Sequence, residues 1–477
     1  MSVPLVRSAA GWSLQKARRE AQQQLPLLMN SQLTKQLAAD IAAGAVKRGA
    51  SAAEVIIRQR TELSVGVRLG EIETLQESTD RGLGLRVLID GRQASVSGSD
   101  FSRDALLSLT DEAVELARLT SPDDTAGLPE PEDFASSLPD LDLWDESIVG
   151  LSTEAQIEMA LRAERAAQEY SSQITNFDGG GFDSGHGSFI LVNSLGFSGE
   201  FRATSCSLAS VPVAAENGKM QRDYWYDMRR KLSELDSPEE IGIMAARRTL
   251  RKLGSRSVPT QAVPVVLEPN IARDLLGDVF SAASGESIFR KSSFLVGQLG
   301  EQIANERLTV IDDGVMPRGL GSRPFDGEGL PTRRTVVIND GVLESYLLNS
   351  YTARKLGLKS TGNAGRGLSG APGVEAGNLY IKPGSYSPGE IIKSVSKGLL
   401  ITELLGFGVN IVTGDYSRSA GGIWIENGEL TFPVQGVTIA GNLKEMLNSI
   451  EMIGNDLDFR GSVVAPTLLI GRMTIGA

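Results

Sequence analysis

The stretch from Gly82 to Ser97, GLGLRVLIDGRQASVS, predicts a β-hairpin. Its two apolar-rich runs flank Asp90-Gly91, a pair that accepts the positive φ angles of a tight turn. A second turn is expected at Leu69-Gly70. Earlier strands are expected at residues 53–58, 63–69 and 71–78. Because hairpins pair neighbouring strands in opposite directions, the first half of the chain should contain a largely antiparallel sheet.

Amphipathic helices are expected beside this sheet. Apolar residues recur at every fourth position over 33–45, and Ser102 has the chemistry of a helix N-cap. Thr153 and Gln156 have the spacing of a capping box and predict a third helix. The Pro-, Asp- and Ser-rich residues 119–149 predict a long surface connection. Further strands are expected at 189–193, 197–207 and 211–215.

The second half of the chain is richer in strands and turns. Hairpin turns are expected at Asn339-Asp340-Gly341 and at Glu426-Asn427-Gly428-Glu429. Helices are expected to begin at Ser237-Pro238 and Ser387-Pro388. We predict an α+β fold with an N-terminal mixed α/β domain, whose helices cover a largely antiparallel sheet, and a C-terminal β-rich, barrel-like domain. The expected divisions are an N-terminal extension over 1–30, a first domain over 31–240 and a second domain over 241–477.

Composition sets the broad class of the protein. A chain of 477 residues is too long for one ordinary core, which favours two domains. Hydrophobic residues make up 41% and charged residues 22%, an ordinary globular balance. The net charge of −12 argues against a nucleic-acid partner. No apolar run of about 18 residues predicts a membrane span, and the N-terminal region lacks the pattern of a signal peptide, so we expect a cytoplasmic protein with no membrane partner.

The chain has one cysteine and one histidine. Cys206 by itself excludes an intrachain disulfide and a zinc cage built from cysteines. His186 lies in the glycine-rich residues 180–187, which we interpret as a surface loop, with a role in proton transfer as the less favoured alternative. Most catalytic zinc sites take two or three histidines, so this chain is poorly supplied for one.

Three segments of the second half, 285–295, 309–329 and 412–422, combine glycine with acids and bases at high density. Taken by themselves, they are expected to be polar loops between strands. Neither GxGxxG after a strand nor a phosphate-binding Gly-Lys-Ser loop occurs, so nucleotide binding has no support.

These segments, with residues 351–362 (YTARKLGLKSTG) and 437–443 (VTIAGNL), resemble the PmbA/TldE branch of the TldD/TldE family. The similarity runs from the helix near Leu33 to the end of the chain. The resemblance implies a two-domain fold and a dimer. It also implies a TldD subunit that binds zinc through an HExxxH helix, in a pair that cleaves small or unfolded peptides. Family roles include maturing a peptide antibiotic and degrading an antitoxin.

The sequence departs from the zinc-binding branch of that family. The segment that stands where the TldD helix would be, Leu267 to Leu276, has helical spacing but no histidine. The C-terminal cysteine ligand of TldD is absent from residues 453–462. Glu268 and Asp274 are carboxylates that could bind a hard cation, but a helix cap and a solvated charge are the favoured interpretations. We therefore expect no metal, no cofactor and no catalytic residue in this chain, with zinc carried by a TldD-like partner.

Other chemistries find little support in the residues. The acids Asp312, Asp313, Asp326 and Glu328 resemble a carboxylate cluster for acid–base work, but turn-forming aspartates beside glycine are favoured. The serines that stand out lack a histidine, and Lys291 beside Ser292 has poor geometry for a Ser–Lys pair, because neighbours on a strand point to opposite faces. Those serines are Ser292, Ser293 and Ser417.

The sequence is best interpreted as a non-catalytic subunit of a TldD/TldE-type peptidase. It would form a heterodimer with a TldD-like zinc peptidase, or a homodimer, and take up peptides by strand addition at a sheet edge. The alternatives are a self-sufficient metallopeptidase with an atypical site and a peptide-binding, chaperone-like module without a protease partner. The residues proposed to line a peptide chamber are Arg290, Lys291, Ser292, Asp326, Glu328, Asp415 and Arg418.

Overall fold

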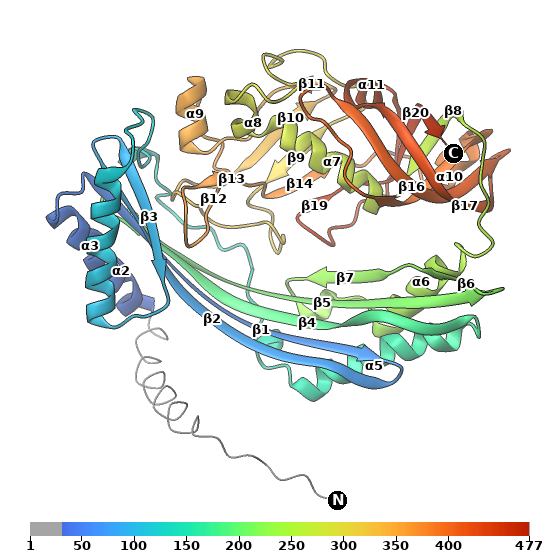
Figure 1. The fold of residues 1–477 in the computed structure, drawn as a ribbon, viewed down its shortest axis with the longest axis horizontal. Helices are drawn as coiled ribbons and strands as arrows, with labels where there is room; N and C mark the ends of the chain where they lie inside the picture. Colours follow the sequence, from blue (N-terminus) through green and yellow to red (C-terminus); the bar gives the residue numbers. More distant parts are fainter. Residues whose placement is uncertain (1–30, 477) are drawn as a thin grey trace, which may run out of the picture.

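The structure is a computed structural model that describes residues 31–476. The expected N-terminal extension, residues 1–30, lies outside the described residues. Figure 1 shows the first half of the chain as a long curved sheet, with the second half packed within the curve. Phe325 of the second half joins the two, because its ring lies 5.1 Å from that of Phe197 and 5.5 Å from that of Phe201, centroid to centroid.

The first sheet is antiparallel and has the strand order β3-β2-β1-β4-β5-β6, with β7 paired to β5. Its strands are long, which lets the sheet curve into a half-barrel. The strands are β1 (Ala52–Arg68), β2 (Glu71–Ile89), β3 (Arg92–Gly98), β4 (Ile174–Asn193), β5 (Ser198–Glu216), β6 (Lys219–Arg222) and β7 (Trp225–Arg229).

The strand boundaries correct the sequence prediction. Strands expected separately on either side of residues 59–62 form the single strand β1, and β2 is likewise continuous through residues 79–81. The glycine-rich residues 180–187 are not a loop but part of β4, between β1 and β5. A Cβ atom on Gly181 or Gly187 would collide with carbonyl oxygens of β1. The glycines therefore allow a close approach of two strand backbones, which a loop-like composition conceals.

Helices cover the side of this sheet that faces away from the second half (Figure 1). Ser102 caps α3 as predicted, and Ser237 forms a capping box with Glu240 at α6. The cap of α5 is Ser152, one residue before the predicted Thr153. The helices are α2 (Ser31–Lys47), α3 (Arg103–Leu119), α5 (Thr153–Tyr170) and α6 (Pro238–Leu250), with the short α4 (Glu146–Val149), η1 (Pro131–Asp133) and η2 (Leu232–Glu234) in the connections.

The second half contains a closed barrel. Strand β17 pairs with β16 on one side and β20 on the other, so that β17, β16, β15, β8 and β20 form a ring, and β18 extends from β20. The barrel-like prediction and the α+β class are confirmed, with 26% helix and 40% strand. The barrel strands are β8 (Gln261–Leu267), β15 (Lys397–Leu405), β16 (Asp415–Glu426), β17 (Glu429–Asn442), β18 (Ile450–Ile453) and β20 (Leu468–Gly476).

A smaller sheet, in the order β11-β10-β9-β14-β19, lies beside the barrel. Its strands, with the separate pair β12–β13, are β9 (Val310–Asp313), β10 (Arg334–Asn339), β11 (Val342–Leu343), β12 (Ala364–Gly365), β13 (Gly373–Val374), β14 (Asn378–Ile381) and β19 (Val463–Val464). The helices of this half are α7 (Pro269–Ala283), α8 (Gly285–Phe289), α9 (Ser350–Leu356), α10 (Pro388–Ser394) and α11 (Leu443–Asn448). No helix among the described residues is long and apolar enough to span a membrane.

Local turn chemistry was the most dependable signal in this half. Asp340 and Gly341 have φ angles of 46° and 82°, and Asn427 and Gly428 have 53° and 79°, so both predicted hairpin turns are confirmed. The expectation that 412–422 is a loop is wrong beyond its first residues, because β16 begins at Asp415. At the start of this barrel strand the exposed residues Asp415, Ser417 and Ser419 alternate with less exposed ones, and their polar side chains give the stretch the composition of a loop.

Candidate functional site at helix α7

Helix α7 is where a zinc-binding helix of the family would be expected. Glu268 has the extended backbone of an N-cap, with φ −62° and ψ 158°, and Pro269 occupies the first turn, where its missing N–H costs nothing. The apolar residues of α7 are buried in the large core of the second half. The remaining side of the helix carries the half-buried polar residues Arg273, Asp274 and Asp278.

The Glu268 carboxylate is held by two arginines at the C-terminal end of helix α6, of which Arg251 is the C-cap residue. Arg248 donates to it at 2.9 Å, and Arg251 donates with both terminal nitrogens, at 2.6 Å and 2.9 Å. Burial alone would raise the pKa of Glu268, but the hydrogen bond from Arg251 and the charge of Arg248 outweigh it and lower the pKa. The carboxylate is therefore ionised and its oxygens are occupied.

This ion pair continues into a larger cluster between the two halves. Asp223 lies 3.5 Å from Arg248 and 3.5 Å from the Lys252 ammonium, which also pairs with Glu403 of the barrel at 3.2 Å. The side chain of Asp223 is only 3% exposed, so the pairing offsets a large desolvation cost. The ion pairs at the start of α7 therefore connect the end of helix α6 to the barrel.

One turn further along, α7 meets a residue that the sequence analysis had singled out. Arg418 of β16 donates to Asp274 at 3.3 Å, so the structure brings these two together. Arg273 donates to the Tyr226 hydroxyl of strand β7 at 2.9 Å. Burial raises the pKa of Asp278 to about 6, against the pull of Arg418. The polar side of α7 therefore contacts both halves and contains a carboxylate that titrates in the physiological range.

The donor set at α7 does not fit a zinc ion. Two guanidinium groups occupy the one carboxylate at the helix start, and their charge would repel a cation. No group of three His, Cys, Asp or Glu side chains able to hold a metal occurs among residues 31–476. The single histidine and cysteine lie on the first sheet. His186 packs edge-on against Trp144, with ring centroids 5.9 Å apart, and burial raises the pKa of Cys206 to about 12, which disfavours a thiolate ligand.

Four of the other predicted residues lie on exposed or half-buried surface of the second half. Arg290 pairs with Glu286 at 2.8 Å, Lys291 follows α8 with a φ of 56°, and Ser292 donates to the Ser287 carbonyl at 3.2 Å. Asp415 accepts a hydrogen bond from Thr413 at 2.7 Å. Their role as lining of a peptide chamber stays a prediction, as does that of Arg418.

The remaining two predicted residues, Asp326 and Glu328, are interior groups. Each is 1% exposed, so neither presents its carboxylate on the surface of this chain. Asp326 accepts the backbone N–H groups of Glu328 at 2.9 Å and Leu330 at 3.0 Å, which is the turn-forming role favoured from the sequence. Glu328 accepts the Ser350 N–H at 2.8 Å. Burial, assisted by the charge of Asp326, raises the pKa of Glu328 to about 7.

A buried ionic cluster near Glu328 was missed by the sequence analysis. Glu54 of β1 is 0% exposed and pairs with Arg86 of β2 at 2.6 Å and with Arg366 of the second half. This pairing joins the first sheet to the second half of the chain. A signal was present, because Glu54 and Arg86 are single charges within apolar runs and a lone charge there requires a partner.

Solved structures share this architecture. A crystal structure of a Bacteroides thetaiotaomicron protein, named as a candidate modulator of DNA gyrase, matches with a TM-score of 0.86 and 30% identity, covering 93% of this chain and 98% of that one. TldE from Thermococcus kodakarensis matches with a TM-score of 0.83 and 23% identity, covering 92% of this chain and 99% of its own. The half-barrel and closed barrel together define a TldE-like fold.

Sequence comparison defines the family. Three family models, described as PmbA/TldA metallopeptidase domain 1, central domain and C-terminal domain, match residues 53–117, 146–253 and 260–477. Metalloprotease PmbA of Escherichia coli O157:H7 is 42% identical over 423 residues, covering 89% of this chain and 92% of that protein. A PmbA homolog of Haemophilus influenzae is 35% identical, covering 90% and 93%. The chain belongs to the PmbA/TldD metallopeptidase family, which confirms the resemblance seen in the sequence.

Proposed function

We propose that this chain is a non-catalytic subunit that pairs with a zinc-bearing TldD-like peptidase and helps to enclose the space in which peptides are cleaved. The state of Glu268 carries the proposal. Where a catalytic subunit would present metal ligands, this helix begins with a carboxylate held by Arg248 and Arg251. A zinc site needs free ligands and a metal-bound water, and this arrangement offers neither.

The free edge of strand β2 supports a role in peptide capture. Strand β3 pairs with β2 only from Leu83 onward, so residues 71–82 pair with β1 alone in the described part of the chain. Most side chains of residues 71–80 are exposed, and an unpaired strand edge offers backbone donors and acceptors to an extended peptide. The acids Glu71, Glu73 and Glu77 on this strand would favour a basic peptide.

A second candidate is a metallopeptidase that acts without a partner. The relative from Escherichia coli, 42% identical, is named a metalloprotease, and this name favours activity in the chain itself. A carboxylate-bound metal site would then have to lie away from the start of α7, where arginines hold Glu268. We rank this candidate second because Glu268, the carboxylate at that helix start, is already neutralised by its arginines.

Zinc content and cleavage distinguish the two candidates. The full chain is purified after growth in zinc, its bound metal is measured by mass spectrometry, and an unstructured fluorogenic peptide is offered with and without a TldD-like subunit. We expect less than about 0.1 zinc per chain, because residues 31–476 contain no three-ligand site, and cleavage only in the mixture. The control mixture contains a TldD-like subunit whose HExxxH glutamate is replaced by glutamine. Stoichiometric zinc with chelator-sensitive cleavage by the chain alone would refute the proposal, as would a mixture that never associates.

A further inference from the structure

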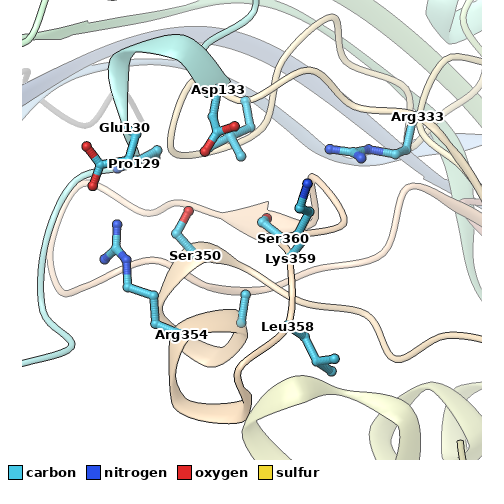
Figure 2. Close-up of a pocket in the computed structure, with 11 residues that line it drawn as sticks. Pro129, Glu130, Asp133, Arg333, Ser350, Arg354, Leu358, Lys359 and Ser360 are labelled. Carbon is cyan, nitrogen blue, oxygen red and sulfur yellow. The ribbon is translucent and has the colours of Figure 1, made fainter.

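A pocket of about 330 Å³ lies between the long connection of the first half and helix α9 of the second half. Figure 2 shows its two walls. The connection supplies Glu130, the N-cap of the short helix η1, and Asp133 at the end of that helix, and the second half supplies Arg333, Lys359 and the hydroxyl of Ser350. This volume lies at the lower end of the range of small-molecule sites, roughly 300–1,000 Å³. The pocket is distinct from the α7 site, and none of the predicted chamber residues lines it, although Glu328 accepts a hydrogen bond from the Ser350 N–H.

The charges that line this pocket are partly segregated, because Arg333 and Lys359 lie on one side and Glu130 and Asp133 on the other, where Arg354 also lies. Arg333 and Lys359 extend toward each other on one side, whereas Glu130 and Asp133 belong to the other wall (Figure 2). Glu130, Asp133, Arg333 and Lys359 form no ion pair within the described part of the chain, whereas the Arg354 guanidinium donates to backbone carbonyls. Two cations that approach each other without an acid between them repel, and an anionic group placed there would relieve that repulsion.

The Ser350 hydroxyl is an independent sign of a ligand. The residue is 6% exposed and lines the pocket, and its Oγ atom makes no hydrogen bond of normal geometry among residues 31–476, with only a weaker interaction with the Glu328 carboxylate (Figure 2). A buried polar atom with so weak a partner is costly, which marks a place where a ligand group or a bound water belongs. The backbone N–H of the same residue is fixed by Glu328, so the hydroxyl sits on a rigid support.

Neighbouring contacts show that the pocket is a built feature. Arg354 of α9 donates to the carbonyl oxygens of Thr125 at 3.1 Å and Gly127 at 3.2 Å, and the Tyr351 hydroxyl donates to Asp123 at 2.8 Å. These bonds pin the connection to α9 just before it reaches η1. The acidic wall is therefore held opposite the basic wall by contacts that do not involve the four pocket charges.

We propose that this pocket binds a small zwitterion, namely a free amino acid or a short peptide with free ends. The carboxylate of the ligand would lie between Arg333 and Lys359, its ammonium group would face Glu130 and Asp133, and the Ser350 hydroxyl would donate to or accept from the ligand. The proposal does not depend on the partner-subunit role, because the pocket is complete within one chain. Binding is therefore measured on the chain alone, and its failure leaves the proposed role of α7 untouched.

The test uses alanine and trialanine as probes. Binding to the full chain is followed by chemical-shift or calorimetric titration, with N-acetyl-trialanine and trialanine amide as forms that lack one charge. We expect saturable binding of at least one free-ended probe and a loss of about tenfold or more when either charged end is removed, the size of one lost charge-assisted hydrogen bond. Whether alanine or trialanine binds more tightly identifies the source of the ligand.

Matched variants locate the binding in the pocket. Arg333→Gln and Glu130→Gln should each weaken the best probe about tenfold. Arg334→Gln and Glu132→Gln change the same charges at residues outside the pocket and should leave binding unchanged. Ser350→Ala should weaken binding while changing the melting temperature by only a few degrees, because its hydroxyl makes no hydrogen bond of normal geometry with the described residues and only a weak interaction with Glu328. Binding that survives acetylation of the probe, a loss shared equally by the control variants, or no saturable binding would overturn the proposal.

Discussion

Glu268 and Glu328 are both withdrawn from water near the junction of the two halves, yet their pKa values are shifted in opposite directions. Glu268 accepts hydrogen bonds from two guanidinium groups, and its pKa is lowered in spite of burial. Glu328 accepts a backbone N–H and has Asp326 as a neighbour, and burial raises its pKa to about 7. Burial therefore does not fix the charge of a carboxylate. The nearest hydrogen-bonding partners determine that charge. The two regions should therefore respond to mutation and pH in opposite ways.

The largest expected effect comes from breaking the Glu268 region. In Glu268→Gln, Asp223 is the one acidic partner left to Arg248 and Arg251 among the described residues. The mostly buried cluster then carries an excess of positive charge. Removing one partner of a buried pair costs several kcal/mol, so we expect a loss of about 3–4 kcal/mol in the free energy of unfolding at pH 7, measured by urea denaturation. Because the folded pKa of Glu268 is lowered, this contribution is present above its unfolded value and is lost as the pH falls through the folded value.

Glu112→Gln is the control for this variant, because Glu112 is exposed on α3 and forms no ion pair with the described residues. It should change the free energy of unfolding by less than about 0.5 kcal/mol. If Glu268→Gln cost no more than the control, the ion pairs of Glu268 with Arg248 and Arg251 would contribute nothing to stability, and Glu268 would be free to bind a cation.

The second prediction concerns Glu328, whose pKa is raised where that of Glu268 is lowered. Because the folded pKa of Glu328 is about 7, above the ordinary value of 4.5, its contribution to stability is present below pH 4.5 and is lost as the pH rises through 7. Glu328→Gln keeps an acceptor for the Ser350 N–H and removes the buried charge. We expect this variant to be about 2–3 kcal/mol more stable relative to the wild type at pH 8 than at pH 4.5, measured by urea denaturation at both values. An equal difference at both pH values would contradict the raised pKa.

Asp278 is a third carboxylate near the junction, and it is less buried than Glu268 and Glu328. Asp278 of α7 has a pKa of about 6, because burial raises it while Arg418 opposes the rise and Asp274 adds to it. The group is only partly buried, so solvent screening reduces the effect. Asp278→Asn should stabilise the protein by about 1 kcal/mol at pH 8 and by nothing measurable at pH 4. Calorimetric melting at the two pH values checks this, and a destabilisation at pH 8 would mean that the attraction between ionised Asp278 and Arg418 outweighs the cost of burying the charge.

The contrast between Glu268 and Glu328 also marks what a sequence can and cannot predict. The helix after Glu268 was predictable, because Pro269 and the apolar spacing of Ile271 and Leu275 are local signals. The arginines that hold Glu268 were not, since they lie at the end of α6, about twenty residues earlier, and reach it only through packing of the two halves. The turn role of Asp326 was likewise local, whereas the burial of Glu328 depends on the first sheet.

The strands show the same division. The turns at Asp90-Gly91 and Asn427-Gly428 were predictable, because positive φ angles select those residues. The continuity of β1 and β4 was not, because it depends on pairing partners far along the chain, such as Arg60 with Gly187. Polar or glycine-rich stretches that read as loops become strands when a neighbour satisfies their backbone hydrogen bonds.

The smallest effect is expected at Glu286, which has an arginine partner but is exposed to water. Glu286 pairs with Arg290 at 2.8 Å across one turn of α8, but both side chains are more than half exposed. Exposed pairs of this spacing contribute about 0.3–0.5 kcal/mol, because water screens the charges and ordering two long side chains costs entropy. Glu286→Gln should therefore lower the free energy of unfolding by no more than about 0.5 kcal/mol, with the loss fading as salt is raised to about 1 M. A cost approaching that of Glu268→Gln would mean that the arginine partner alone, and not its burial, sets the strength of such pairs. It would also indicate that the surface around Arg290 is covered in solution, as the predicted peptide chamber would require.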